Sequence, residues 1–360
     1  MIFTINLIFS FICAYSFSYF NNLKPKNRFL SYLLVLSPVW IIWLIICGGQ
    51  YYVGTDYETY YNIFKYADTD HYHFKHEHIF AWIVECSSYL GFHPQTTFFI
   101  FYFIGFIFLI YIISKLNHKT SFIYIFIYLT ISTVFHNQLN TLRQYIASYI
   151  ITSAIIFLYN KKGRLKFILL TICASLIHLS SVFVLPFALL EEKYKFNYKT
   201  AKNLLILSLI FLCVGNLSWI INIFIELIPI QYKQYLGGAL DFSNNVLFFI
   251  PKLIFVPLYF YSLVLLKKNY IQGLDLFLYK IGFISYCIRL FFMNNNIFNR
   301  IGDLFILLSI FPIYYLLSYL YLTKKNKTYY CICIFFICFY LLKVLIFAKQ
   351  EYLYNSIYIY

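Results

Sequence analysis

The sequence contains little charge and few residues that break regular structure. Of its 360 residues, 11% are Asp, Glu, Lys or Arg, whereas soluble domains contain about 25%. The 12 glycines and 8 prolines are too few for a disordered or collagen-like chain. Hydrophobic residues instead make up 62% of the sequence and aromatic residues 23%. This composition excludes a water-soluble globule and predicts a protein of the lipid bilayer.

The sequence also lacks the motifs of soluble-nucleotide and common hydrolase chemistry. It contains no Walker-type loop, no dinucleotide-binding glycine fingerprint, no zincin helix and no Gly-x-Ser-x-Gly elbow. We therefore expect no soluble-nucleotide chemistry and no cofactor. The nine cysteines lie inside or beside apolar runs, where we interpret them as packing residues rather than as a disulfide framework.

Apolar runs long enough for membrane helices recur along the whole chain. Because roughly 20 apolar residues span the hydrocarbon core, we predict an all-α, polytopic transmembrane bundle of about 11–12 segments. We expect it to form one domain, residues 1–360. The first run lacks a basic start and a small-residue cleavage site, so we expect a membrane helix rather than a signal peptide. The runs are 3–20, 31–48, 97–114, 121–135, 145–160, 167–190, 204–225, 247–266, 276–292, 304–322 and 329–347.

Two segments are not expected to cross the membrane as single helices. The basic loops on both sides of the run 167–190 can face the cytoplasm if this run forms two short helices with a bend near His178, Ser180 and Ser181. The segment 78–90 is short for a span and contains Glu85, so we predict a short amphipathic helix on the outer surface. A tilted crossing is the alternative for that segment.

Basic residues orient the bundle. The 28 Lys and Arg exceed the 13 Asp and Glu, which gives a formal charge of +15. They cluster in joints that we assign to the cytoplasm, so we interpret them as topology signals rather than as a nucleic-acid surface. With this orientation both termini and the loop 49–77 face outward.

Three of the chain's five arginines then fall on the outer side, against the usual bias. Arg143 lies in the joint HNQLNTLRQ, and Arg289 and Arg300 lie in IRLFFMNNNIFNRIGD. A diphosphate ligand is one physical reason for such exceptions, because guanidinium groups grip phosphate and can neutralise a leaving group. The alternative is local pairing with a carboxylate, for example Arg300 with Asp303.

Other polar residues gather on the same side. His178 is suited to proton transfer, although a lone membrane histidine is often only hydrogen-bonded between helices. The loop YYVGTDYETYYNIF combines Gly54, Asp56 and many tyrosines. A carboxylate can accept a hydroxyl proton and aromatic faces stack on sugars, so this pattern indicates a carbohydrate-facing loop. An interfacial aromatic belt is the alternative.

One run, DHYHFKHEH, has metal-like composition. It offers four histidines with Asp70 and Glu77, and zinc needs only three or four such ligands. The run lies in an exposed loop, and the sequence contains nothing that would fix its geometry. We therefore predict no metal site.

Taken in order, several short motifs resemble the EpsG family, which includes Wzy-type O-antigen and capsule polymerases. The resemblance covers most of the chain. One departure is that the family often has an arginine a few residues before the Gly-Thr-Asp, where this chain has Gln50, Tyr51 and Tyr52. The matching residues are Gly54-Thr55-Asp56-Tyr57 with Tyr61 and Phe64, Glu77 before a short helix ending at Leu90-Gly91, Leu142-Arg143-Gln144 with Ala147, His178-Leu179-Ser180-Ser181, Tyr232 and Tyr235, and Asn299-Arg300-Ile301.

The resemblance implies a GT-C-like glycosyltransferase of the bacterial inner membrane whose active site faces the periplasm. Such an enzyme polymerises oligosaccharide repeat units carried on undecaprenyl diphosphate, by inverting transfer to an acceptor hydroxyl and without a metal. The implied partners are the lipid-linked oligosaccharide, membrane lipid and a chain-length regulator protein.

Our hypothesis for the site assigns Arg143 and Arg300, helped by Arg289, to the donor diphosphate. His178 or Asp56 takes the acceptor proton, with His178 preferred. Two other functions stay open: a flippase for the same lipid-linked oligosaccharide, and an acyltransferase acting on surface sugars. The residues expected to bind substrate are Arg289, Glu77, Tyr57, Tyr61, Gln144, Tyr232 and Tyr235.

Overall fold

The structure, a computed structural model, describes residues 2–20, 27–159, 163–189, 196–214, 253–293, 301–346 and 352–358. Across these ranges all regular elements are helical, and the one extended pairing is an isolated antiparallel bridge between Gln50 and Ser356. The all-α prediction is confirmed.

The chain divides into two compact units, Met1–Leu190 with Leu320–Tyr360, and Glu191–Tyr319. The prediction of a single domain stays a prediction. The first unit contains α1 (Ile2–Phe20), α2 (Arg28–Val35), α3 (Ser37–Gly48), α4 (Tyr57–Tyr66), α5 (Asp70–Phe74), α6 (His78–Tyr89), α7 (Pro94–Lys115), α8 (Ser121–Thr130), α9 (Val134–Asn137), α10 (Leu142–Leu158), α11 (Arg164–Ser175), the 3₁₀ helix η2 (Leu179–Leu189), α22 (Asn326–Leu341) and the π-helical turn η5 (Leu342–Ile346).

The second unit is built around α18 (Gly273–Phe291). This helix packs on α12 (Tyr198–Val214) and on α20 (Ile306–Ser309), and α12 also contacts α17 (Val264–Lys267). The rings of Tyr259, in α16 (Val256–Ser262), and Tyr286 stack on each other. Helix α21 (Phe311–Leu322) contains the boundary between the units.

Three described helices are long and apolar enough to cross a membrane: Ile2–Tyr19, Pro94–Lys115 and Asn326–Ile346. A fourth candidate is the pair α2 and α3, which is bent by 63°. The bend lies next to Pro38, at the start of α3. Helix α2 does not continue through this position, because proline cannot donate the backbone hydrogen bond that a continuous helix requires. The length and composition of these helices indicate a helical membrane protein. The 11–12 crossings and the GT-C-like arrangement remain predictions.

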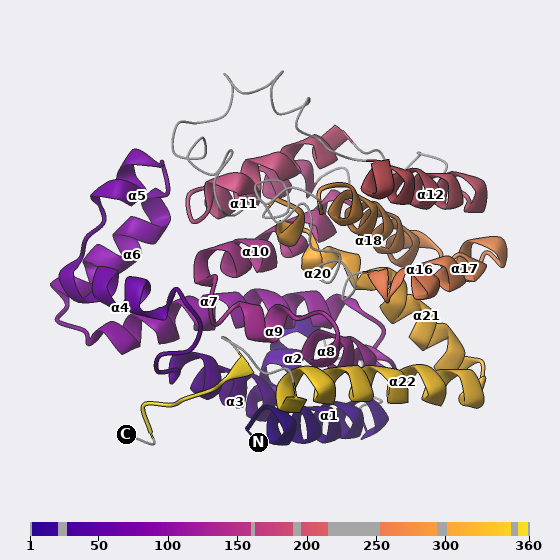
Figure 1. Cartoon of the computed structure of the whole chain (residues 1–360), viewed down its shortest axis with the longest axis horizontal. Helices are drawn as coiled ribbons and strands as arrows, with labels where there is room; N and C mark the ends of the chain where they lie inside the picture. The colour runs from indigo at the N-terminus through magenta and orange to yellow at the C-terminus, as the bar shows by residue number, and fades with distance from the viewer. Residues whose placement is uncertain are drawn as a thin grey trace. The chain divides into compact units, whose positions relative to one another are not determined.

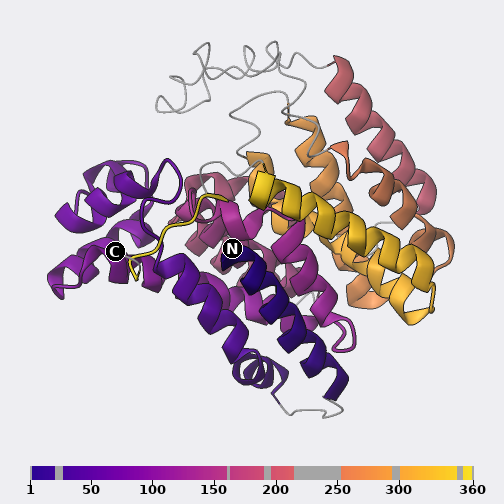
Figure 2. The ribbon, with the colours of Figure 1, turned by 60° about the horizontal axis from the view of Figure 1, so that its bottom comes forward.

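Helix α7 lies at the centre of the first unit. It contacts α2, α3, α4, α6, α8 and α10, consistent with a sequence that is apolar on all sides. A Cβ atom at Gly105 would lie 2.7 Å from Ile146 and 2.9 Å from Tyr149 of α10. Glycine therefore allows the two helices to approach closely, as small residues do in membrane bundles where van der Waals packing drives association. In Figure 2, α1 runs beside α3, which it contacts.

Helices α4, α5 and α6 are short and lie together, and α4 and α6 contact α7 (Figure 1). The predicted helix at 78–90 is confirmed as α6, residues 78–89. The predicted break near His178 is also confirmed: α11 ends at Ser175 and η2 begins at Leu179. The backbone carbonyl of Leu176 accepts hydrogen bonds from the amides of Ile79 and Phe80, at 2.9 and 3.3 Å. The start of α6 is therefore hydrogen-bonded to the segment between α11 and η2.

Candidate functional site

A buried glutamate, Glu77, joins three segments that are far apart in the sequence. One carboxylate oxygen, Oε2, accepts a hydrogen bond from Nη1 of Arg143. The other, Oε1, accepts one from the Leu179 amide at 3.0 Å and lies 3.3 Å from Nδ1 of His178. Glu77 is 1% exposed. The structure therefore brings three of the predicted site residues, Glu77, Arg143 and His178, into one cluster.

Aromatic rings surround the guanidinium of Arg143. Its Cζ lies 4.5 Å from the centre of the Tyr72 ring and 5.2 Å from that of Phe80, and its Nε donates a hydrogen bond to the Tyr60 hydroxyl at 3.4 Å. Arginine is attracted to such faces by the ring quadrupole. Arg143 thus has a carboxylate partner, but one 66 residues away in the sequence rather than a local one.

Glu77 stays ionised in this setting. Burial by itself would raise its pKa, but the hydrogen bond with His178, the charges of Arg143 and His178 and the Leu179 amide outweigh burial and lower the pKa to about 2. At neutral pH the cluster therefore contains a fixed Glu77–Arg143 ion pair, with one imidazole beside the carboxylate.

Local geometry at the start of α6 directs the Glu77 side chain into the cluster. Glu77 is the residue before the helix and does not cap it through its side chain. The amides of Ile79 and Phe80 are instead satisfied by Leu176, so the carboxylate is available to Arg143 and Leu179. A carboxylate at a helix N-terminus is also favoured by the helix dipole.

The Gly54–Asp56 turn is attached to the same region through Asn140. Asn140 Oδ1 accepts hydrogen bonds from the Asp56 amide at 2.8 Å and from the Thr55 hydroxyl at 3.2 Å. Asp56 then precedes α4, whose Tyr60 reaches Arg143. Asn140 lies three residues before Arg143, so a single joint holds both the turn and the arginine.

Three other predicted residues of the first unit, Tyr57, Tyr61 and Gln144, are described by the structure. Tyr57 is buried, donates a hydrogen bond to Gln95 Oε1 at 3.0 Å and stacks on Phe98. Tyr61 is half-buried and stacks on Tyr57. Gln144 is 8% exposed. Tyr57 therefore anchors α4, whereas Tyr61 lies nearer the surface.

A buried network of glutamine and tyrosine side chains that includes Gln50 was not predicted from the sequence. Gln95 donates to the Gln50 carbonyl at 2.9 Å, Gln50 donates to the Tyr102 hydroxyl at 3.2 Å, and Tyr102 donates to the Gln138 carbonyl at 2.9 Å. The Tyr149 hydroxyl donates to Gln138 Oε1 at 2.7 Å. Gln50 stands just before the Gly-Thr-Asp turn, so the residues that lead into the turn are tied to the joint that holds Arg143.

The C-terminal segment pairs with the same stretch. The Tyr51 amide donates to the Asn355 carbonyl at 3.1 Å, and the Ile357 amide donates to the Gly49 carbonyl at 3.0 Å. These bonds form the bridge between Gln50 and Ser356.

The histidine-rich run, residues 70–78, contains α5 and ends at the first residue of α6. Nε2 of His73 lies 2.6 Å from Glu85, and Nδ1 of His73 lies 3.1 Å from Nδ1 of His78. Across the described part of the chain, no group of three or more His, Cys, Asp or Glu side chains is arranged to hold a metal ion.

The remaining predicted residues lie elsewhere. Arg289 belongs to the second unit, where Nη1 donates to Ser309 Oγ at 3.1 Å and Nη2 lies 3.6 Å from Asp303. Asp303, considered above as a partner for Arg300, is thus paired with Arg289. Arg300, Tyr232 and Tyr235 lie outside the described residues.

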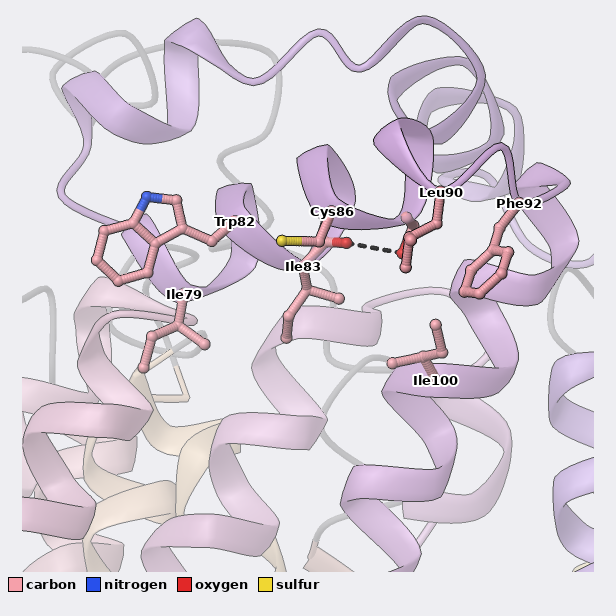
Figure 3. Close-up of a pocket in the computed structure, with 8 residues that line it drawn as sticks. Ile79, Trp82, Ile83, Cys86, Leu90, Phe92 and Ile100 are labelled. Atoms are coloured by element: carbon pink, nitrogen blue, oxygen red, sulfur yellow. Dashed lines mark hydrogen bonds between the residues drawn. The ribbon is translucent and has the colours of Figure 1, made fainter.

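An apolar groove of about 340 Å³ is lined by α6, by Phe92 and by Ile100 of α7. Figure 3 shows Ile79 and Trp82 near one end of the groove and Leu90, Phe92 and Ile100 near the other. Phe80, on the buried side of α6, packs near Arg143. Helix α6 therefore separates the charged cluster from an apolar surface.

Tyr60, Tyr72 and Asn140 are the site residues that the sequence interpretation missed. The two tyrosines are hard to single out because the sequence contains 38 of them. The polar joint HNQLNTLRQ was recognised, but nothing in the sequence indicates that its second asparagine holds the Gly-Thr-Asp turn.

No curated protein and no solved structure matches the chain. The sequence model of the EpsG family matches residues 33–360. Because this match covers nearly the whole sequence, the chain belongs to the EpsG family, a family of Wzy-like polymerases.

Proposed function

We propose that this protein polymerises oligosaccharide repeat units carried on undecaprenyl diphosphate at the periplasmic face of the bacterial inner membrane. The reaction transfers the growing glycan from its lipid diphosphate to a hydroxyl of an incoming lipid-linked unit, with inversion at the anomeric carbon. Family membership and the membrane-spanning helices support this proposal.

The convergence of Arg143, Glu77 and His178 is the observation that carries the proposal. A buried ion pair with an adjacent imidazole is costly to assemble, and here it joins residues from three distant segments. Displacement of a diphosphate by a hydroxyl requires a group that accepts a proton and N–H donors for the leaving phosphate. Imidazole and guanidinium groups supply these two functions.

In this proposal the roles of the arginines differ. Glu77 compensates the charge of Arg143, so Arg143 contributes N–H donors rather than net positive charge. We assign the remaining neutralisation of the donor diphosphate to Arg300, because Arg289 already has a carboxylate partner in Asp303. Asp56 and Tyr61 orient the acceptor sugar.

Purified protein incubated with a defined lipid-linked repeat unit tests the proposal. We expect products that differ by whole repeat units. If the protein leaves the repeat unit unchanged in a membrane-like environment, the proposal is wrong.

The glycan profile of a deletion strain separates this function from its competitors. Single repeats on the final acceptor indicate lost polymerisation. Complete loss of exported repeats indicates a flippase, and long polymers of altered mass indicate an acyltransferase.

A further inference from the structure

We infer that Glu77 is a positioning residue that holds the imidazole of His178 as the base of the transfer reaction, and that Asp56 is not that base. This inference rests on the proposed function and adds to it the group that orients the proton acceptor and the exclusion of Asp56 from that role.

Glu77 contacts both the ring of His178 and the backbone of the residue that follows it. Oε1 lies 3.3 Å from Nδ1 of the ring and accepts the amide of the next residue, Leu179, at 3.0 Å. The two contacts hold the side chain and main chain at the break between α11 and η2 relative to one carboxylate. Oε2 is held by Arg143, so the carboxylate itself has little freedom to turn.

This arrangement selects one tautomer of the imidazole. An ionised carboxylate accepts hydrogen bonds but donates none, so Nδ1 carries the proton that faces Glu77. The lone pair of the neutral ring is then on Nε2. The same carboxylate stabilises the imidazolium that forms when Nε2 takes a proton, which is the function of the carboxylate in a Ser-His-Asp triad.

The transfer step balances with these groups. The acceptor hydroxyl oxygen forms a bond to the anomeric carbon, and the bond from that carbon to the diphosphate oxygen breaks. The electron pair of the broken bond leaves with the lipid diphosphate. The hydroxyl proton passes to Nε2 of His178 and is later released to water.

The surroundings of Asp56 indicate a different role. Asn140 holds the backbone amide of Asp56, and the Asp56 carboxylate accepts the Thr55 hydroxyl at 3.2 Å. Asp56 is half-buried at the beginning of α4. A carboxylate on a turn that is fixed in this way can hold an acceptor hydroxyl, whereas the ring of His178 has a buried counter-charge for the protonated state.

Steady-state kinetics of Glu77→Gln against pH tests the inference with the purified full-length protein and the lipid-linked repeat unit. We expect kcat to fall by about 100-fold or more, as for loss of general base catalysis. KM should change little. The acidic limb of the kcat profile should move to lower pH, because an amide does not stabilise the imidazolium. Glu77→Asp should recover part of kcat.

Two further variants keep the test independent of folding. Glu77→Gln leaves Arg143 without its counter-charge and can therefore destabilise the protein. The double variant Glu77→Gln/Arg143→Gln avoids this effect because it removes both charges. We expect the double variant to have normal abundance and a low kcat. The matched control is Glu85→Gln, since Glu85 also pairs with a histidine, His73, but lies outside the cluster. Glu85→Gln should leave kcat and its pH profile unchanged.

Several outcomes would overturn the inference. The double variant could retain the wild-type kcat, or Glu77→Gln could leave the acidic limb in place. Asp56→Asn could remove that limb while Glu77→Gln does not. If the wild-type protein itself produces no polymer, the proposed function fails instead, so the two failures are distinguishable.

Discussion

At the scale of single residues, the cluster depends on mutual compensation of buried charges. Removing one partner of a buried ion pair leaves the other charge uncompensated, at a cost of about 3–5 kcal/mol. Glu77 is 1% exposed, and the side chain of Arg143 is 18% exposed. Each should therefore be intolerant of substitution alone.

We predict that Arg143→Met lowers the stability of the detergent-solubilised protein by about 3 kcal/mol. The reason is that Glu77 then stays buried without a cation. Thermal unfolding, with Glu77→Gln/Arg143→Met as the control, measures the loss. The double variant should recover most of it, and equal stability of the wild type and Arg143→Met would show that the pair contributes little.

The same pair predicts a dependence of stability on pH. The pKa of Glu77 is about 2 in the folded protein, below its ordinary value of 4.5. Its contribution is therefore complete above about pH 4.5 and is lost as the pH falls toward 2. The stability difference between wild type and Glu77→Gln should shrink over this window. A difference that is constant down to pH 2.5 would contradict the assignment.

At the scale of elements, the apolar runs predicted the positions of helices more accurately than the positions of breaks between helices. The bend near His178 was predicted because the charge pattern required the run 167–190 to turn. The break between α2 and α3, and the end of α8 at Thr130, fall inside runs predicted as single helices. Hydrophobicity does not register such breaks, because both sides of each break are apolar.

The Gly54–Asp56 turn allows a controlled substitution. Gly54 has φ of +76°, and a Cβ atom there would lie 2.7 Å from Asn140 Oδ1. Gly54→Ala should therefore cost more than about 1 kcal/mol and lower polymer yield. Gly91 has φ of +69° but no atom within 4 Å of such a Cβ, so Gly91→Ala isolates backbone strain. If both variants lose equal activity, the contact with Asn140 is not important.

Part of the candidate site was predictable because its residue types are rare. Arg143 and His178 stood out because arginine and histidine are uncommon in so apolar a chain. The partners that give them their chemistry were not predictable: Glu77 was expected to bind substrate rather than to pair with Arg143 and His178, and Tyr60 and Asn140 are ordinary residues in the sequence. These contacts join positions 66 to 102 residues apart around Glu77, and no local pattern encodes that pairing.

At the scale of the whole molecule, the orientation in the membrane is the next testable property. The charge pattern predicts residues 49–77 outside and the joint 115–120 inside. An epitope inserted after Asp68 should bind antibody on intact spheroplasts, whereas one inserted after His118 should require permeabilisation. Both insertions fall between helices. The reverse pattern would place the Glu77 cluster on the cytoplasmic side.

Polymer formation in vesicles tests the central claim most directly. Wild-type protein and His178→Gln, reconstituted at equal amounts, receive the same lipid-linked repeat unit, and the products are separated by length. We predict a ladder of repeats from the wild type and almost only single repeats from His178→Gln. Ladders of equal length and yield from both proteins would contradict the account.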